Sequence, residues 1–259
     1  MRPLGVTTEP PKQRTGNRRR RVVVVVGAGV LIVATAVALV ASGVVWPNRL
    51  FAAAHTTRGV DVSSYQGTID WPVLGSQNID FAIIKATEGS GSQDSRFAEN
   101  WSGAHDTDLL VGAYHFVSFD SEGVTQAQNV IETVPDAPGS LPVTVDVEFY
   151  GRYFEHPPTR TRVRDILDPL LAALEDHYGS PPIIYTTAEA YDRYIRDAYP
   201  DNLIWIRSVV LPPVMPDGRD WAFWQYSHRD SLPGYDGEEH YIDMNVFDGS
   251  VRELRALAG

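Results

Sequence analysis

Two acidic residues, Asp146 and Glu148, stand two positions apart within residues 141–149. They alternate with Val145 and Val147, so the pattern predicts a buried strand with valines on one face and acids on the other. At about 3.3 Å of rise per residue, the two acidic Cα atoms lie roughly 6.6 Å apart. Carboxyl groups this close repel when both are ionised, so one holds a proton near neutral pH. A protonated acid beside an ionised one can cleave a glycosidic bond. The plainer alternative is a surface strand with two solvated acids.

Two further acids occupy similar positions in other predicted strands. Asp61 stands between two valines, and Asp243 stands between an isoleucine and a methionine. Both should point into a barrel while their neighbours pack outward. If the first and last strands adjoin, as barrel closure requires, these acids lie side by side near the first pair. Salt bridges to inward-facing bases are the structural alternative, for which Lys85 is the obvious candidate and Arg207 a second.

Short apolar runs alternate with helical segments from Arg58 to the C-terminus. The alternation predicts a parallel sheet and an α/β fold. Eight strands with about five helices indicate an irregular TIM-like barrel, with helices in its first part and mostly strands in its last. Chemistry in such barrels takes place at the C-terminal ends of the strands. The predicted strands are residues 59–63, 80–86, 110–117, 141–149, 182–187, 203–207, 221–226 and 241–246, and the predicted helices are residues 71–77, 95–106, 122–134, 159–178 and 188–197.

The fourth predicted helix, residues 159–178, carries leucine and isoleucine at helical spacing. Gly179 is placed to end it, because glycine readily adopts the left-handed conformation that follows many helices. Pro169 interrupts the pattern and lacks a backbone N–H, so we expect a kink or an early break there.

The N-terminal region has a different composition. Residues 22–45 carry no charge and are long enough to cross a bilayer. Arginines at 14 and 18–21 precede them, so the positive-inside rule places the N-terminus in the cytoplasm and the rest outside. We predict a disordered basic cytoplasmic tail (1–21), a single-pass anchor (22–45), a linker (46–57) and a catalytic barrel (58–259). The alternative is a signal peptide cleaved near Ala54, giving a secreted protein.

Charge also divides the chain. The first 50 residues carry eight bases and one acid, so the other 209 carry 14 bases and 32 acids, a net charge of −18. A domain this acidic is a poor partner for nucleic acid or an anionic bilayer surface. There is no cysteine, so no disulfide stabilises the exported part. With only seven histidines as well, a structural zinc site is not expected, and we expect no metal, no cofactor and a monomer.

Seven short motifs occur in a fixed order from Gly59 towards the C-terminus. They are GVDVSSYQG (59–67), FAIIKATEG (81–89), GAYHF (112–116), DVE (146–148), YTT (185–187), FWQYS (223–227) and DMN (243–245). Each is weak alone, but the ordered set closely resembles glycoside hydrolase family 25, the N-acetylmuramidases called Chalaropsis-type lysozymes. The family fold is an irregular barrel of eight strands and five helices, which agrees with the element count.

The resemblance implies hydrolysis of the β-1,4 bond between N-acetylmuramic acid and N-acetylglucosamine in peptidoglycan, whose glycan strands would be the partner. Glu148 would be the general acid, and Asp146 would hold the geometry and stabilise positive charge. Asp61 and Asp243 would complete the acidic cluster. Either a carboxylate or the acetamido group of the substrate could be the nucleophile, and the sequence does not choose between them.

Groups suited to a sugar surround these acids in the sequence. Aromatic side chains offer flat faces to pyranose rings, and polar groups can reach the hydroxyls. For two aromatics, Trp224 and Tyr226, core packing is an equal alternative, and Glu88 could form a loop salt bridge instead of touching ligand. Asn245 fits a hydrogen-bonding neighbour of the acids better than a direct catalyst. The candidate substrate-binding residues are Tyr65, Lys85, Tyr114, His115, Tyr185, Trp224, Gln225 and Asn245.

Three other functions compete with this interpretation. A chitinase-like enzyme would need an aspartate two residues before Asp146, where Thr144 stands. A catalytically weak peptidoglycan-binding module would be expected to lack one of the acids. A metal-dependent hydrolase lacks histidines at convincing spacing. If Glu148 must stay protonated, activity should peak below neutral pH, and an anchored enzyme would suit remodelling of the cell's own wall.

Overall fold

The computed structural model describes residues 15–41 and 47–258. The chain divides at residue 46 into an N-terminal unit and a compact barrel unit, each described here by itself. Residues 1–14 of the predicted tail, residues 42–45 of the predicted anchor and residue 46 of the predicted linker lie outside the described residues.

The N-terminal unit contains one helix, α1 (Thr15–Ala41). Within it, Arg20–Val40 has a mean hydropathy of 2.9 over its most apolar window and is long and apolar enough to cross a membrane. The helix starts before the apolar stretch, so residues 15–21 are helical and not disordered as expected. Arginine has a high helix propensity, which lets the basic run continue the apolar helix.

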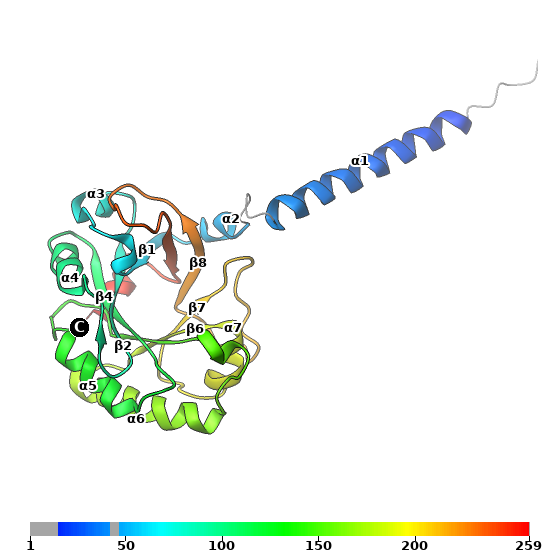
Figure 1. Cartoon of the computed structure of the whole chain (residues 1–259). Coiled ribbons are helices and arrows are strands. Elements are labelled where there is room, and N and C mark those ends of the chain that lie inside the picture. Colours follow the sequence, from blue (N-terminus) through cyan, green and yellow to red (C-terminus); the bar gives the residue numbers. More distant parts are fainter. Residues whose placement is uncertain (1–14, 42–46, 259) are drawn as a thin grey trace, which may run out of the picture. The chain divides into compact units, whose positions relative to one another are not determined.

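The barrel unit consists of eight strands in a closed ring, with helices outside it (Figure 1). Around the ring the order is β1, β2, β4, β5, β6, β7, β8 and β9, and β9 returns to β1. A two-residue strand, β3, extends β2 outside the ring. The strands are β1 (Thr57–Val62), β2 (Phe81–Glu88), β3 (Ser92–Gln93), β4 (Leu110–Phe116), β5 (Thr144–Val147), β6 (Ile183–Thr187), β7 (Ile204–Arg207), β8 (Phe223–Asp230) and β9 (Ile242–Phe247).

Strand β9 closes the ring and runs antiparallel to both of its neighbours, whereas the other pairs within the ring are parallel. The expectation of a parallel sheet is therefore wrong for this last strand. The segment from residue 231 to 241 that joins β8 to β9 contains no helix, and a parallel pair would need a longer crossover. Closure pairs Asp61 directly with Asp243, as predicted from the sequence.

All five helices predicted in the barrel are present, with ends shifted by a few residues. Helix α6 continues through Pro169 without the expected break, so the burial of its apolar face offsets the missing hydrogen bond. Gly179 ends it in the left-handed conformation, with φ of 73°. The helices are α3 (Trp71–Gly75), α4 (Phe97–His105), α5 (Gly123–Thr133), α6 (Arg160–Tyr178), α7 (Ala188–Ala190) with a π-helical turn (Tyr191–Ile195), and α8 (Val251–Leu257), besides two 3-10 turns, η1 (Ser64–Gln66) and η2 (Gly151–Phe154).

The strands separate two apolar clusters. Inside the ring, Phe81, Trp205 and Phe223 belong to one apolar cluster with Leu254 of α8, and Trp205 also borders the pocket that holds the acids. Outside the ring, residues that alternate with the inward ones pack under the helices. In β5, Val145 is fully buried in this outer cluster. The alternation that buries the valines outward is what turns the acids of β5 inward.

Half of the predicted linker, residues 46–57, lies in regular elements of the barrel unit. Residues Asn48–Ala52 form a short helix, α2, and β1 already begins at Thr57. The Asn48 side chain is fully buried and donates to the carbonyl oxygens of Ser208 (2.6 Å) and Tyr226 (3.3 Å). Arg49 pairs with Asp230 of β8 at 2.6 Å. These long-range contacts, and not local helix propensity, hold α2 on the barrel.

The first turn of α5 gives a test of helix packing. A Cβ atom at Gly123 would lie 1.9 Å from the carbonyl oxygen of Ile166 on α6. Replacing Gly123 by alanine should therefore lower the free energy of unfolding by about 1–3 kcal/mol, through overpacking between α5 and α6. Denaturant unfolding measures this. The control is Gly91→Ala, where the new Cβ meets nothing within 4 Å and the change should stay within about 0.5 kcal/mol. Equal effects of the two substitutions would contradict the described packing.

Candidate active site

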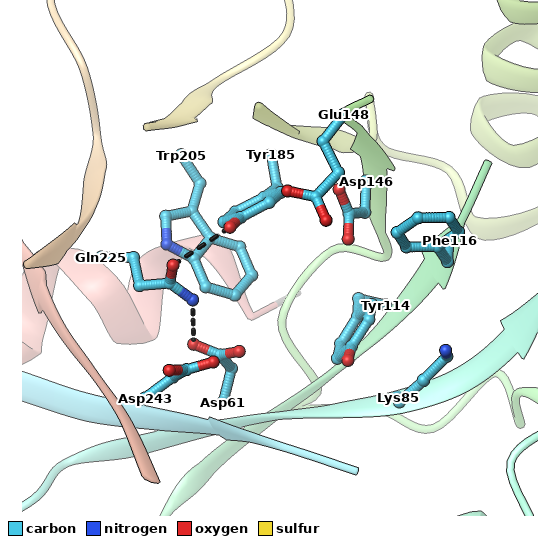
Figure 2. Close-up of a pocket in the computed structure, with 10 residues that line it drawn as sticks. All are labelled: Asp61, Lys85, Tyr114, Phe116, Asp146, Glu148, Tyr185, Trp205, Gln225 and Asp243. Atoms are coloured by element: carbon cyan, nitrogen blue, oxygen red, sulfur yellow. Dashed lines mark hydrogen bonds between the residues drawn. The ribbon is translucent and has the colours of Figure 1, made fainter. Parts of the chain in front are cut away.

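The four acids meet in a pocket at one end of the barrel. It lies where the parallel strands end and where the antiparallel β9 begins, which is the end expected for chemistry in this architecture. Figure 2 shows the acids converging from opposite sides of this mouth, with aromatic rings between them. The lining residues are Asp61, Lys85, Tyr114, Phe116, Asp146, Glu148, Tyr185, Trp205, Gln225 and Asp243.

Asp146 is the more enclosed acid of the β5 pair. It is 7% exposed, and its register neighbours are Phe116 on β4 and Tyr185 on β6. Its Oδ1 atom is buried without a hydrogen-bond partner among the described residues. Burial, followed by the nearby charges of Glu148 and Asp61, raises the pKa of Asp146 well above its usual value. Asp146 therefore lines the pocket with one carboxyl oxygen enclosed and without a donor among the described residues.

Glu148 follows the last residue of β5 and is only partly buried. It lines the central pocket and also the arm of the cleft beside β6 and β7. Burial raises the pKa of Glu148, the positive charge of Arg207 opposes this, and the negative charge of Asp61 adds to it. The result is an accessible carboxyl that holds its proton at a higher pH than an ordinary glutamate, as a general acid must.

Asp61 differs from the other acids in the donors it receives. Its Oδ2 atom accepts hydrogen bonds from Gln225 Nε2 (2.9 Å) and Asn245 Nδ2 (2.7 Å). Those amides are fixed in turn, because Tyr185 donates to Gln225 (3.0 Å) and Trp205 donates to Asn245 (2.8 Å). Burial raises the pKa of Asp61, but these two amide donors act in the opposite direction. Since donated hydrogen bonds favour the charged form, we assign the negative charge of the cluster to Asp61.

Asp243 lies directly opposite Asp61 in the β1–β9 pair. Burial, the charge of Asp61 and a hydrogen bond to Asp61 together raise the pKa of Asp243 to about 9. Two adjacent carboxyls thus share one proton, with Asp61 as the acceptor. Closure of the ring by β9 creates this pairing.

Two cationic side chains belong to the cleft. Lys85 donates to Glu88 at 2.8 Å and lies 5.3 Å from the centre of the Phe116 ring, so the salt bridge considered for Glu88 is present. Arg207 is the last residue of β7, and it lines a side arm of the cleft together with Glu148. The positive charge of Arg207 favours ionisation of Glu148, Asp61 and Asp243.

The central pocket opens into two neighbouring hollows. One shares Asp61, Lys85, Tyr114 and Asp243 with it and continues towards Tyr65. The other shares Glu148, Tyr185, Gln225 and Asp243 with it and continues towards Arg207. Because they share lining residues, the three hollows together form one cleft across the mouth. Tyr65 is 72% exposed at one end and lies outside the central pocket.

Two predicted substrate-binding residues do not face the cleft, and that part of the prediction is wrong. His115 is fully buried on the outer side of β4, between Thr87 (2.8 Å) and Gln126 (3.0 Å). Trp224 is buried in the outer cluster, and its Nε1 donates to Ser208. His115 follows the inward-facing Tyr114, and Trp224 precedes the inward-facing Gln225. Neighbouring side chains of a strand point to opposite faces, so both residues point outward. Tyr226, two residues after Trp224, lies in the same outer cluster.

The other predicted residues lie in the cleft or directly behind it. Asn245 does not line the pocket and acts through its bond to Asp61, as its sequence position indicated. Two lining residues were missed, Phe116 and Trp205. The sequence could have indicated Trp205, because it stands two residues before Arg207, a candidate inward-facing base, and residues two apart in a strand share a face. Among the described residues, no group of three or more His, Cys, Asp or Glu side chains is arranged to hold a metal ion.

Comparison with known proteins gives consistent matches. The model of glycosyl hydrolases family 25 matches residues 60–235. A solved family 25 glycosyl hydrolase from Bacillus anthracis is 50% identical, with a TM-score of 0.76, over 80% of this chain and 95% of its own. A solved lysozyme from Streptomyces coelicolor is 30% identical, with a TM-score of 0.69, over 78% of this chain and 96% of its own. Lysozyme M1 of Streptomyces globisporus is 31% identical over 78% of this chain and 71% of its own length.

The protonation of Asp243 generates a prediction about stability. The folded chain holds this proton up to a pKa of about 9, whereas an unfolded aspartate loses it at about pH 4. Between these values the unfolded state binds fewer protons, so the stability of the fold decreases as pH rises through this window. Asp243→Asn stays neutral and can still donate to Asp61. At about pH 8 it should be more stable than the wild type by about 1 kcal/mol or more, since one pKa unit corresponds to about 1.4 kcal/mol.

The advantage of Asp243→Asn should disappear below about pH 3, where Asp243 is protonated in both the folded and the unfolded wild type. Thermal unfolding across this range measures it, with Asp176→Asn on the exposed side of α6 as the control. An advantage that does not change with pH would overturn the protonation assigned to Asp243.

Proposed function

The chain belongs to glycosyl hydrolases family 25, and from this membership we propose how its cleft cleaves a glycan. It is a glycoside hydrolase of the lysozyme type that acts on peptidoglycan. The bond is the β-1,4 linkage between N-acetylmuramic acid and N-acetylglucosamine. The proposed assignment of roles depends on one observation above all, the two carboxyls of unequal burial that β5 presents at the mouth of the barrel.

Glu148 is the general acid in this proposal. It reaches both the central pocket and the Arg207 arm, so it borders the path of a glycan that lies along the cleft. Its raised pKa favours the protonated form that a general acid needs. The proton passes to the glycosidic oxygen as the bond from the anomeric carbon to that oxygen breaks, and positive charge develops on the sugar. The resulting carboxylate then accepts a proton from the water that completes hydrolysis.

Asp146 stabilises and orients the reacting sugar. A carboxyl nucleophile must be ionised, and burial together with Glu148 and Asp61 opposes ionisation of Asp146. This favours attack by the carbonyl oxygen of the acetamido group of the substrate, with the Asp146 side chain, which lines the pocket, as the group that hydrogen-bonds and orients the acetamido group. Asp61 supplies negative charge across the pocket, where it offsets the positive charge of the transition state.

The anchored location is proposed as well. A family of this activity acts outside the cell, at the wall. Two observations support an uncleaved anchor. The stretch Arg20–Val40 is 21 residues long, and α2 with its buried Asn48 belongs to the folded barrel unit. Cleavage near Ala54 would remove α2 and leave the carbonyl oxygens of Ser208 and Tyr226 without the Asn48 donor.

Substitution of the general acid tests the catalytic assignment. Glu148→Gln cannot supply the proton, so hydrolysis of purified peptidoglycan should fall by about 10²–10⁴-fold. Mass spectrometry of released fragments should show reducing N-acetylmuramic acid ends with the wild type. Glu175→Gln, on the exposed side of α6, should retain full activity. Retained binding of an intact glycan by the wild type itself would instead identify a wall-binding module without activity.

Localisation in the native host tests the anchor. The full-length protein should sediment with membranes, be released by detergent and not by salt, and retain its N-terminal residues. Asn48→Ala should leave this fractionation unchanged while lowering the unfolding temperature, because it removes two hydrogen bonds to buried carbonyls. Mature protein in the culture medium with a new N-terminus near His55 would establish cleavage and secretion.

A further inference from the structure

The cleft is acidic, yet its proposed substrate carries carboxyl groups. N-acetylmuramic acid has a lactyl group that ends in a carboxyl or continues into a peptide with carboxyls of its own. Four acids line the central pocket, and residues 51–259 have a net charge of −18. A carboxylate that approaches this cleft is repelled unless a cation receives it.

Two side chains with a fixed positive charge line the described cleft, Lys85 and Arg207. Lys85 is already occupied, since its ammonium group lies 2.8 Å from Glu88 and over the ring of Phe116. A histidine, His228, also lines both outer hollows, but burial and the charges of Arg207 and Arg229 lower its pKa. Its positively charged form is therefore disfavoured.

Arg207 is different from Lys85. Its guanidinium forms no ion pair or side-chain hydrogen bond with another described residue. Its backbone pairs with Thr187 of β6 on one side and Gln225 of β8 on the other, which fixes its position at the C-terminal end of β7. It is partly buried and shares its arm of the cleft with Glu148. A guanidinium presents a planar set of donors that matches a carboxylate in two parallel hydrogen bonds.

We propose that Arg207 binds a substrate carboxylate in the arm of the cleft beside Glu148, and so selects glycans that carry acidic substituents. The inference rests on the proposed peptidoglycan hydrolysis and adds a specificity residue to it. Glu189, Phe149 and Phe154 line the same arm, so the acidic group enters beside two apolar rings, and Glu189 disfavours a second negative group there. The simpler alternative is that Arg207 only offsets the charge of the acid cluster.

The test couples a change in the enzyme to a change in the substrate. Soluble glycan fragments with peptide stems are compared with the same fragments after their carboxyls are converted to amides. Amidation should lower kcat/KM of the wild type by about tenfold or more, the effect of losing a hydrogen bond to a charged group. Arg207→Gln should show a similar loss on the untreated fragments and no further loss on amidation. Arg207→Lys should lie between them, because it keeps the charge without the planar donors.

Controls separate the possible failures. Arg162→Gln, on the surface of α6 in a pair with Glu122, should respond to amidation as the wild type does. Fragments stripped of peptide stems keep only the lactyl carboxyl, so their response identifies which carboxyl is bound. If Arg207→Gln and the wild type lose the same factor on amidation, the proposal is overturned. An equal loss on both substrates with a shifted pH profile would mean that Arg207 acts only through Glu148. A wild type that cleaves neither substrate would refute the proposed function itself.

Discussion

Four carboxyl groups in one barrel mouth are the constraint on which the structure depends. Four negative charges enclosed together would oppose folding, so the site requires unequal environments for its acids. Asp61 receives two amide donors and carries the charge. Asp243 lies opposite it and keeps a proton. Asp146 is enclosed without a partner for one oxygen, and Glu148 remains accessible. Each difference follows from the position of the acid on its strand.

The barrel supplies these positions. Closure by the antiparallel β9 brings together two acids that are 182 residues apart in the chain, as the register of Asp61 with Asp243 shows. Every second side chain of a strand points outward and packs under the helices. The side chains between them point inward and gather at the centre of the barrel. Behind the acids, Trp205 and Tyr185 donate hydrogen bonds to the side-chain amides of Asn245 and Gln225, which in turn donate to Asp61. The aromatic residues therefore shape the cleft and also set the protonation of the acids.

Much of this was predictable from alternation and order. The β5 pattern predicted the inward face of Asp146, and the need for closure predicted the contact between Asp61 and Asp243. Alternation also turns His115 and Trp224 outward, because each stands next to a residue that lines the pocket, Tyr114 and Gln225. Helix α2 could not be predicted in this way. It is five residues long, and its stability comes from long-range contacts of Asn48, which no local pattern reveals.

The measurement that tests this account most directly is a ¹³C NMR titration of the side-chain carboxyls. Aspartate and glutamate would be labelled, and Asp61→Asn and Asp243→Asn would assign the signals. We expect Asp61 to ionise at the lowest pH of the four, Asp243 to keep its proton through neutral pH, and Glu148 to titrate above an ordinary glutamate. Four signals that ionise together near about pH 4, the range of exposed carboxyls, would contradict it. The unequal protonation on which the proposed chemistry rests would then be absent.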